Sequence, residues 1–295
     1  MDLSDALTVL YRGRLVSCNY ACDYCPFAKR VESKEEQVAD AHALADFYEW
    51  VEARRRPTAV FFTPWGEALV RPWYRETFIA LSKLPHVVKV AVQTNLHASV
   101  AFLEGADVTK VGLWCTYHPS QVSLERFVGR CEQLIRRRVS FSVGAVGRRD
   151  QLSAIEALRA ALPPEVYVWI NAYRPEVETH TEQERARMLA VDPRMQDNLH
   201  PHPSRGLACR TGHTVVTVDG VGDVRRCHFV PEVLGNIRDP GWERALGPRP
   251  CPNEACRCHI GYVHLEPLQL HQVYGEGLLE RVPVRIGGPP PSATT

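Results

Sequence analysis

Three cysteines close together near the start of the chain are the residues best placed to do chemistry. Cys18, Cys22 and Cys25 have the spacing C-x3-C-x2-C, directly after an apolar run that predicts a strand. A closed structural zinc site needs four ligands, whereas three thiolates on a cubane iron–sulfur cluster leave one iron open. A zinc ion would need a fourth ligand from a distant part of the chain, so the loop favours an open iron–sulfur cluster.

A second group of thiols lies in the last third of the chain. Its members are Cys209, Cys227, Cys251, Cys256 and Cys258, followed by His259. The dipeptide Asp219-Gly220 between two alternating runs predicts a hairpin that places Cys227 opposite Gly212, near Cys209. Five thiols and an imidazole exceed what one metal ion or one cubane requires, so at least one of them is not a ligand.

Composition excludes several kinds of partner. The 35 Lys and Arg residues nearly balance the 34 Asp and Glu residues, which leaves a formal net charge of +1. The chain therefore has no excess positive charge that could bind nucleic acid or an anionic membrane. No apolar run approaches the length of a membrane span, and the apolar stretch 6–11 is too short for a signal peptide. We therefore expect a cytoplasmic protein whose thiols stay reduced.

The elements that must position these cysteines follow an alternating pattern. β-Branched or apolar runs alternate with amphipathic stretches as far as residue 173, which is typical of an α/β protein with a parallel sheet. Six strands are predicted, at residues 7–12, 59–63, 88–93, 110–116, 140–146 and 166–172.

Two helices are well marked in this half. Ser33 and Glu36 have capping-box spacing, and apolar residues then recur at helical spacing. A second helix is predicted at 124–137, where Cys131 belongs to the apolar face and is interpreted as a core thiol rather than a ligand. Residues 179–205 predict a helix and a loop with His200 and His202, which we interpret as exposed rather than as metal ligands.

The first cysteine loop resembles the defining motif of the radical S-adenosylmethionine (radical SAM) superfamily, including the aromatic Tyr24 before the last cysteine. The resemblance implies a partial (β/α)6 TIM-type barrel with Cys18, Cys22 and Cys25 as the catalytic, cluster-binding residues. It implies a [4Fe-4S] cluster whose open iron binds S-adenosylmethionine. Reductive cleavage then yields methionine and a 5′-deoxyadenosyl radical that abstracts hydrogen from the substrate. Whether S-adenosylmethionine is consumed or regenerated stays open.

Polar residues follow the predicted strands, where a barrel-like enzyme binds its ligands. The turn 63–68 resembles the family's Gly-Gly-Glu-Pro turn that binds the methionyl ammonium. Gly66 and Glu67 match this motif, whereas Trp65 and Ala68 depart from it. Gly147 and Asp150 fit the family's adenine motif loosely.

The resemblance implies further contacts at the other strand ends. The full predicted cofactor-binding set is Tyr24, Gly66, Glu67, Thr94, Asn95, Thr116, His118, Gly147 and Asn171. A structural role for His118 is equally consistent with its position. Three residues are predicted on the substrate side, namely Tyr117, Tyr173 and Arg174, the last of which could instead be a solvated charge.

The pattern C-x12-G-x4-C from Cys209 through Gly222 to Cys227 resembles the SPASM and twitch extensions of radical SAM enzymes. It implies a smaller cysteine-rich α+β extension with an auxiliary [4Fe-4S] cluster, and the preferred ligands are Cys209, Cys227, Cys256 and Cys258, with Cys251 in reserve. A structural zinc held by the same thiols is the alternative. The pattern as a whole is most similar to a small bacterial radical SAM subfamily.

We expect four segments in total. They are a radical SAM barrel at 1–178, a helical linker at 179–205, the auxiliary-cluster domain at 206–280 and a disordered Gly/Pro-rich tail at 281–295.

The resemblance implies an oxidoreductase or C–H modifying enzyme that acts on a small molecule or peptide and receives electrons from a donor such as flavodoxin or ferredoxin. Only 17 residues precede Cys18, so we expect no peptide-binding domain ahead of the barrel. The alternative is a non-catalytic iron–sulfur electron carrier or sensor with a structural zinc site.

Overall fold

The computed structural model describes residues 6–27 and 30–286. Seven α-helices lie in these ranges, at α1 Lys34–Glu52, α2 Pro72–Lys83, α3 Leu124–Arg136, α4 Leu152–Ala161, α5 Glu182–Val191, α6 His259–Tyr262 and α7 Leu270–Tyr274. Strands β1 to β6 are Leu7–Gly13, Thr58–Phe62, Val87–Thr94, Val111–Thr116, Ser140–Gly147 and Val168–Ala172. All six predicted strands are present, with ends shifted by two residues at most.

The later strands are short. They are β7 His202–Pro203, β8 Ala208–Cys209, β9 Val215–Asp219, β10 Asp223–Arg225, β11 Val233–Asn236, β12 Arg249–Pro250 and β13 Ala255–Cys256. One sheet of nine strands has the order β11-β10-β9-β1-β2-β3-β4-β5-β6, and β7 with β13 and β8 with β12 form two small pairs. Neighbours from β9 to β6 are parallel, whereas β10 and β11 run antiparallel.

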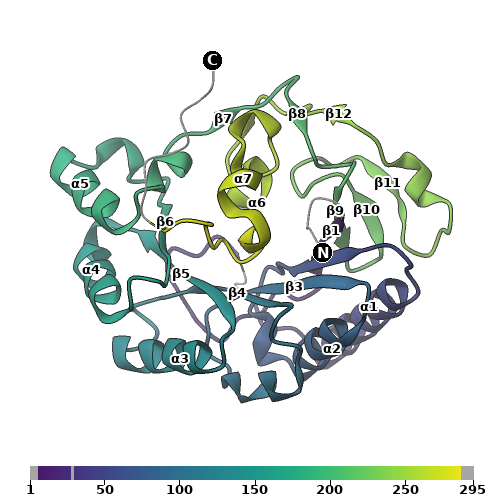
Figure 1. Cartoon of the computed structure of the whole chain (residues 1–295), viewed down its shortest axis with the longest axis horizontal. Helices are drawn as coiled ribbons and strands as arrows, with labels where there is room; N and C mark the ends of the chain where they lie inside the picture. The colour runs from purple at the N-terminus through teal and green to yellow at the C-terminus, as the bar shows by residue number, and fades with distance from the viewer. Residues whose placement is uncertain (1–5, 28–29, 287–295) are drawn as a thin grey trace.

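The main sheet curves into an open barrel. Figure 1 shows its strands in an arc, with α1 to α4 outside and α6 and α7 in the opening. Alternate residues of β1 explain the two cores, since Val9 and Tyr11 pack toward the outer helices while Leu10 packs inside with Trp114 and Ile260. The α/β fold with a partial barrel is therefore confirmed.

The boundary predicted at residue 206 does not divide the sheet. Strand β9 pairs in parallel with β1, with Val216 opposite Val9, so the cysteine-rich half continues the sheet of the first half. The hairpin register also differs from the prediction. Val224 pairs with Val218, and the turn includes Gly222 with a φ of 85°. This shifts Cys227 by three residues, away from a position opposite Gly212.

The chain after residue 278 closes the inside of the barrel. Glu280 is fully buried and forms an ion pair with Lys89 on β3. Arg281 is buried between the rings of Trp114 and Trp169. The predicted disordered tail begins at residue 281, where the structure instead buries Arg281 and Pro283, whereas residues 284–286 are exposed. Residues 287–295 of that tail lie outside the described ranges.

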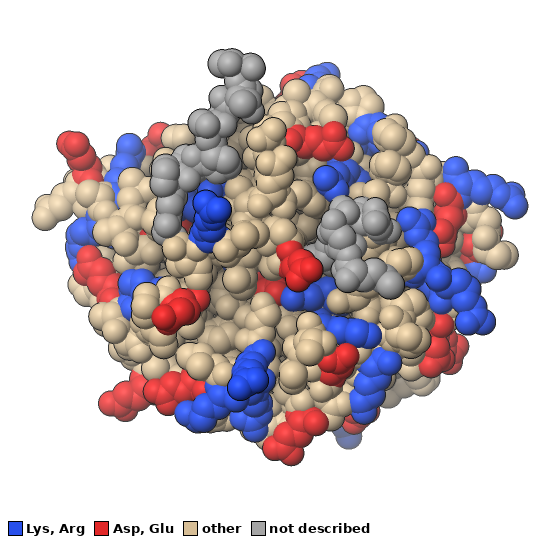
Figure 2. Space-filling view, viewed as in Figure 1, with Lys and Arg blue, Asp and Glu red and all other residues tan. Residues whose placement is uncertain are grey.

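The predicted helices are also observed. The capping box of α1 is formed, since Ser33 Oγ accepts from Glu36 N and Glu36 Oε2 accepts from Ser33 N. Cys131 is completely buried in α3, which confirms its interpretation as a core thiol. Among the described residues, no helix is long and apolar enough to cross a membrane. Figure 2 shows basic and acidic side chains interspersed over the face in view.

Candidate active site

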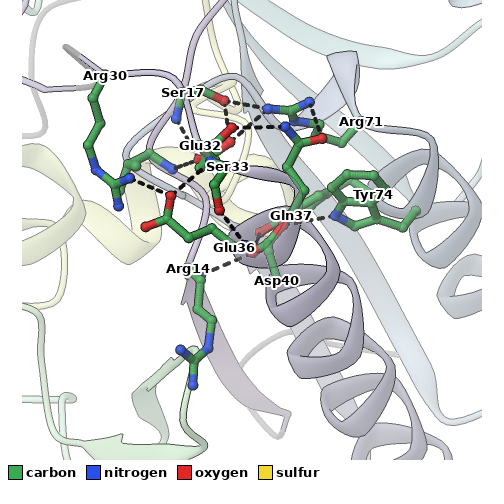
Figure 3. A network of polar contacts seen from close by, with 12 residues as sticks. Arg14, Ser17, Arg30, Glu32, Ser33, Glu36, Gln37, Asp40, Arg71 and Tyr74 are labelled. Carbon is green, nitrogen blue, oxygen red and sulfur yellow. Dashed lines mark hydrogen bonds and ion pairs between the residues drawn. The ribbon is translucent and has the colours of Figure 1, made fainter.

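The loop with the first three cysteines is held at its two ends by one buried carboxylate. Glu32 Oε1 accepts hydrogen bonds from Val16 N at 2.5 Å and Ser17 N at 2.8 Å, and Glu32 Oε2 accepts from Ser17 Oγ. Arg71 donates to both Ser17 Oγ and Glu32 Oε2 at 2.7 Å (Figure 3). Because these bonds join residues before and after the loop, they fix where the chain enters and leaves it.

The turn after β2 packs directly against this loop. A Cβ on Gly66 would lie 1.8 Å from the carbonyl oxygen of Ser17, so only glycine fits there. The next residue, Glu67, donates its N–H to that same carbonyl at 3.0 Å. Gly66 and Glu67 thus hold the backbone one residue before Cys18.

The Glu67 side chain is buried and accepts three hydrogen bonds. They come from Thr94 Oγ1 at 2.7 Å, Asn95 N at 2.6 Å and Leu69 N at 3.1 Å. Burial raises the pKa of Glu67 to about 6. The carboxylate therefore joins the ends of β2 and β3. The binding of the methionyl ammonium by Glu67 stays a prediction, and Thr94, a second predicted cofactor-binding residue, is one of the donors to this carboxylate.

The third strand end approaches the cysteines. Asn95 is buried, and its Nδ2 donates to Asn19 Oδ1 at 3.0 Å and lies 3.7 Å from Cys18 Sγ. The end of β3 is thereby placed beside the first thiol, and the cofactor-binding role of Asn95 stays a prediction.

The end of β4 contributes a histidine beside the second thiol. His118 Nδ1 lies 2.8 Å from Tyr24 Oη and 3.5 Å from Cys22 Sγ. Burial lowers the pKa of His118 to about 4, so the ring is neutral at physiological pH and can accept from the phenol. The rings of Tyr20 and Tyr24 flank His118 with centroids at 5.9 and 6.0 Å.

An arginine that the sequence analysis missed ties this loop to the end of β5. Arg148 donates to both carboxylate oxygens of Asp23, at 2.9 and 3.0 Å, and to Asp150 at 2.7 Å. Its guanidinium lies 5.0 Å from the ring centre of Tyr24 and 5.6 Å from that of Tyr173. Arg148 follows a strand end directly, which is the signal that could have identified it.

Two of the predicted substrate residues make contacts within the protein. Tyr117 is buried and packs on Phe127 of α3, because it faces the outer core. Arg174 donates to the carbonyl oxygens of Leu199 and Arg257, so it joins the end of β6 to the second cysteine segment.

The remaining predicted positions lie at strand ends. Thr116 is half-buried at the end of β4 and Asn171 is exposed near the end of β6. Gly147 ends β5, where a Cβ would approach Ile170 within 2.8 Å.

The second group of cysteines gathers where the short strands meet. Burial raises the pKa of Cys227 and Cys256 to about 12, and neighbouring thiols add to this, from Cys209 and Cys251 for Cys227 and from Cys251 and Cys258 for Cys256. Cys209, Cys251 and Cys256 also pack in one apolar cluster. Burial of its thiol raises the pKa of Cys258, and the positive charges of Arg12, Arg174 and Arg281 partly offset this.

Both groups of cysteines offer thiolate donors, which iron–sulfur clusters and zinc ions both accept. Across residues 6–27 and 30–286, no three His, Cys, Asp or Glu side chains converge closely enough to hold one metal ion. A cubane bonds each thiolate to a different iron, so its ligands stand farther apart than those of one ion. The three thiols of the first loop are the number that a cubane with one open iron uses, and the second group offers five.

Comparison with known proteins supports the same fold. No protein-family model matches the sequence, and no curated protein is similar to it. Among solved structures, the chain is similar to native anSMEcpe, an anaerobic sulfatase-maturating radical SAM enzyme, with bound AdoMet and Kp18Cys peptide. The TM-score is 0.54 at 13% identity, over 82% of this chain and 80% of that chain.

Two further solved structures are similar to the chain. Native anSMEcpe with bound AdoMet gives a TM-score of 0.53 at 13% identity, over 81% of this chain and 82% of that chain. BtrN in complex with AdoMet and 2-DOIA gives 0.39 at 12% identity, over 82% of each chain. The two anSMEcpe structures, with TM-scores above 0.5, show that the chain has their fold.

Proposed function

We propose that this protein is a radical SAM enzyme that removes a hydrogen atom from an unactivated C–H bond of its substrate. The observation that carries the proposal is the convergence of strand ends on one loop of three thiols. Gly66, Asn95 and His118, each beyond a different strand, contact the segment that contains Cys18 and Cys22. A site assembled from several strand ends is typical of barrel enzymes. The anSMEcpe structures, which have the same fold, contain bound AdoMet.

In this proposal Cys18, Cys22 and Cys25 hold a [4Fe-4S] cluster. When bound, such a cluster passes one electron from an external donor of the flavodoxin or ferredoxin type to S-adenosylmethionine, whose S–C5′ bond breaks to give methionine and a 5′-deoxyadenosyl radical that takes a hydrogen atom from the substrate. Neutral His118 and Asn95 orient the thiols, and Tyr24 and Arg148 offer an aromatic and cationic wall beside them.

The second group of thiols is proposed to hold an auxiliary [4Fe-4S] cluster that accepts the electron left on the substrate radical. The five thiols influence one another's pKa, so four of them are close enough in principle to share one cluster. The proposed ligands are Cys209, Cys227, Cys256 and Cys258, with Cys251 in reserve. A structural zinc held by the same thiols is the competing occupant.

The experiment begins with protein reconstituted without oxygen. About eight irons per chain agree with two cubanes, whereas about four irons and one zinc leave a structural second site. The reduced protein should convert S-adenosylmethionine to 5′-deoxyadenosine and methionine. Cys22→Ala should abolish this conversion and Cys256→Ala should retain it. A fully loaded wild-type protein that forms no 5′-deoxyadenosine would favour an electron carrier or sensor instead.

A further inference from the structure

A cavity of about 380 Å³ lies between the two cysteine groups at the mouth of the barrel. Its lining includes Arg12 from β1, Trp65 from the turn after β2, and Thr217, Arg225 and His228 from β9, β10 and the segment beyond. Trp65 precedes Gly66, which contacts the first cysteine loop, and His228 follows Cys227. The cavity is therefore next to both proposed cluster sites, and its volume is that of a small-molecule pocket.

Arg12 brings a positive charge into this cavity without a carboxylate to balance it. Within the described ranges, no hydrogen bond or ion pair reaches its guanidinium, and its buried Nε has no partner. Burial lowers the pKa of Arg12 to about 10, so the group stays charged at neutral pH. Arg225 differs, because Asp219 and Asp223 neutralise it. Of the charged residues that line the cavity, Arg12 and Arg225 are basic and Asp219 is acidic, so the lining has a formal charge of +1, which suits a monoanion.

Aromatic side chains that are exposed to solvent form the apolar part of the cavity wall. Arg12 lies 4.1 Å above the Trp65 ring, and the Phe27 ring packs on Trp65 with centroids at 4.7 Å. Trp65, Phe27 and Phe229 are each more than 40% exposed, which is unusual for large aromatic side chains. Trp65 stands where the similar family motif has a glycine, so this departure from the motif supplies one wall of the cavity. His228 Nε2 is buried there, and no described residue bonds to it.

We infer that this cavity binds the carboxylate of a small substrate with an apolar body, with Arg12 as the anion-binding residue and Trp65 as the stacking surface. The inference rests on the proposed function and adds the substrate class to it. Arg12 also lies near the thiols of Cys227 and Cys258, so a bound carboxylate would hold the substrate between the two proposed clusters.

The test uses three carboxylates and their neutral amides as probes, namely phenylacetate, 3-phenylpropionate and hexanoate. Calorimetric titration of the reconstituted full-length protein should give at least one acid that binds about tenfold more tightly than its amide. Arg12→Gln should remove this preference. Arg14→Gln is the matched control, because Arg14 is exposed two residues away and donates to Gly220 O, and it should keep the preference.

Equal binding of acid and amide in all three pairs, or equal behaviour of the two variants, would overturn the inference. The iron content of each variant distinguishes anion binding by Arg12 from a second explanation, in which Arg12 only stabilises a cluster. If Arg12→Gln loses iron yet keeps the preference for acids, Arg12 only balances the thiolates, and the inference is wrong. Cleavage of S-adenosylmethionine without probe is measured in parallel. If the protein cleaves S-adenosylmethionine but binds acids and amides equally, only this inference is rejected. If it prefers the acids but does not cleave S-adenosylmethionine, only the proposed function is rejected.

Discussion

At the scale of single residues, polar groups that bond within the protein hold the site together. Glu67 accepts three hydrogen bonds and joins the ends of β2 and β3. His118 is kept neutral by burial and contacts both a phenol and a thiol through Nδ1. Loss of such a group leaves its buried partners without a hydrogen bond, which costs stability.

Glu67 should make the stability of the protein depend on pH. Its folded pKa of about 6 exceeds the ordinary value of 4.5, so the folded state binds the proton more tightly. The resulting stabilisation is complete below pH 4.5 and is lost as the pH rises through 6. Between pH 5 and 7.5 the wild-type protein should lose about 1 kcal/mol more unfolding free energy than Glu67→Gln does. Urea unfolding of both proteins measures this difference, and identical pH profiles would contradict it.

At the scale of elements, the cysteine loop is shaped by its neighbours rather than by itself. Glu32 and Arg71 join its two ends, the turn at Gly66 packs under it, and Arg148 ties Asp23 to the end of β5. Two strand ends, the carboxylate of Glu32 and the guanidinium of Arg71 thus constrain the path of a loop that has no regular structure. A partly buried ion pair stabilises a protein only when hydrogen bonds satisfy both charged groups. The hydrogen-bond geometry of these pairs therefore matters more for the loop than their charges do.

Gly66→Ala should disturb this packing. The new Cβ would fall 1.8 Å from the carbonyl oxygen of Ser17, and backbone atoms cannot move aside without displacing the loop. We expect a loss of at least about 2 kcal/mol of unfolding free energy, together with reduced iron in the first loop. Gly129→Ala is the control, because open space surrounds Gly129 on α3 and alanine should stabilise by up to about 1 kcal/mol. Equal unfolding free energies for the two variants would refute the argument.

At the scale of the whole molecule, the two halves of the chain form one body. Strand β9 continues the sheet beyond β1, and α6 with the segment at Leu279 fills the inner face of the barrel. Figure 1 shows α6 and α7, in yellow, in the opening of the arc, while the green strands β10 and β11 lie at one end of the sheet. The cysteine-rich half therefore helps to form the barrel core and is more than a lid on the site.

Glu280→Ala tests this dependence. The buried carboxylate pairs with Lys89 and accepts from Ser140 Oγ at 2.6 Å, so its removal leaves a buried ammonium without a counterion. We expect a loss of about 3–5 kcal/mol in a single cooperative unfolding transition. Glu276→Ala changes an exposed carboxylate nearby and should alter stability by less than about 0.5 kcal/mol. A small effect of Glu280→Ala on denaturant unfolding would mean that the late segment contributes little to the core.

The sequence alone determined the local features of this protein. Period-two and helical patterns identified all six barrel strands and the capped helix α1, because these signals depend on neighbours in the chain. The spacing of Cys18, Cys22 and Cys25 likewise determined the chemistry proposed for the loop, since one short segment contains all three donors.

Only the tertiary structure decided what depends on contacts between distant residues. The pairing of β9 with β1, the burial of Arg281 and the ties of Arg174 to Leu199 and Arg257 join segments far apart in sequence, and no local pattern encodes such pairs. The hydrogen bonds of Glu67 also depend on such contacts. The type and position of Glu67 predicted a cofactor-binding residue. Its three hydrogen-bond donors could not be predicted, because they come together only when the ends of β2 and β3 meet in the folded chain.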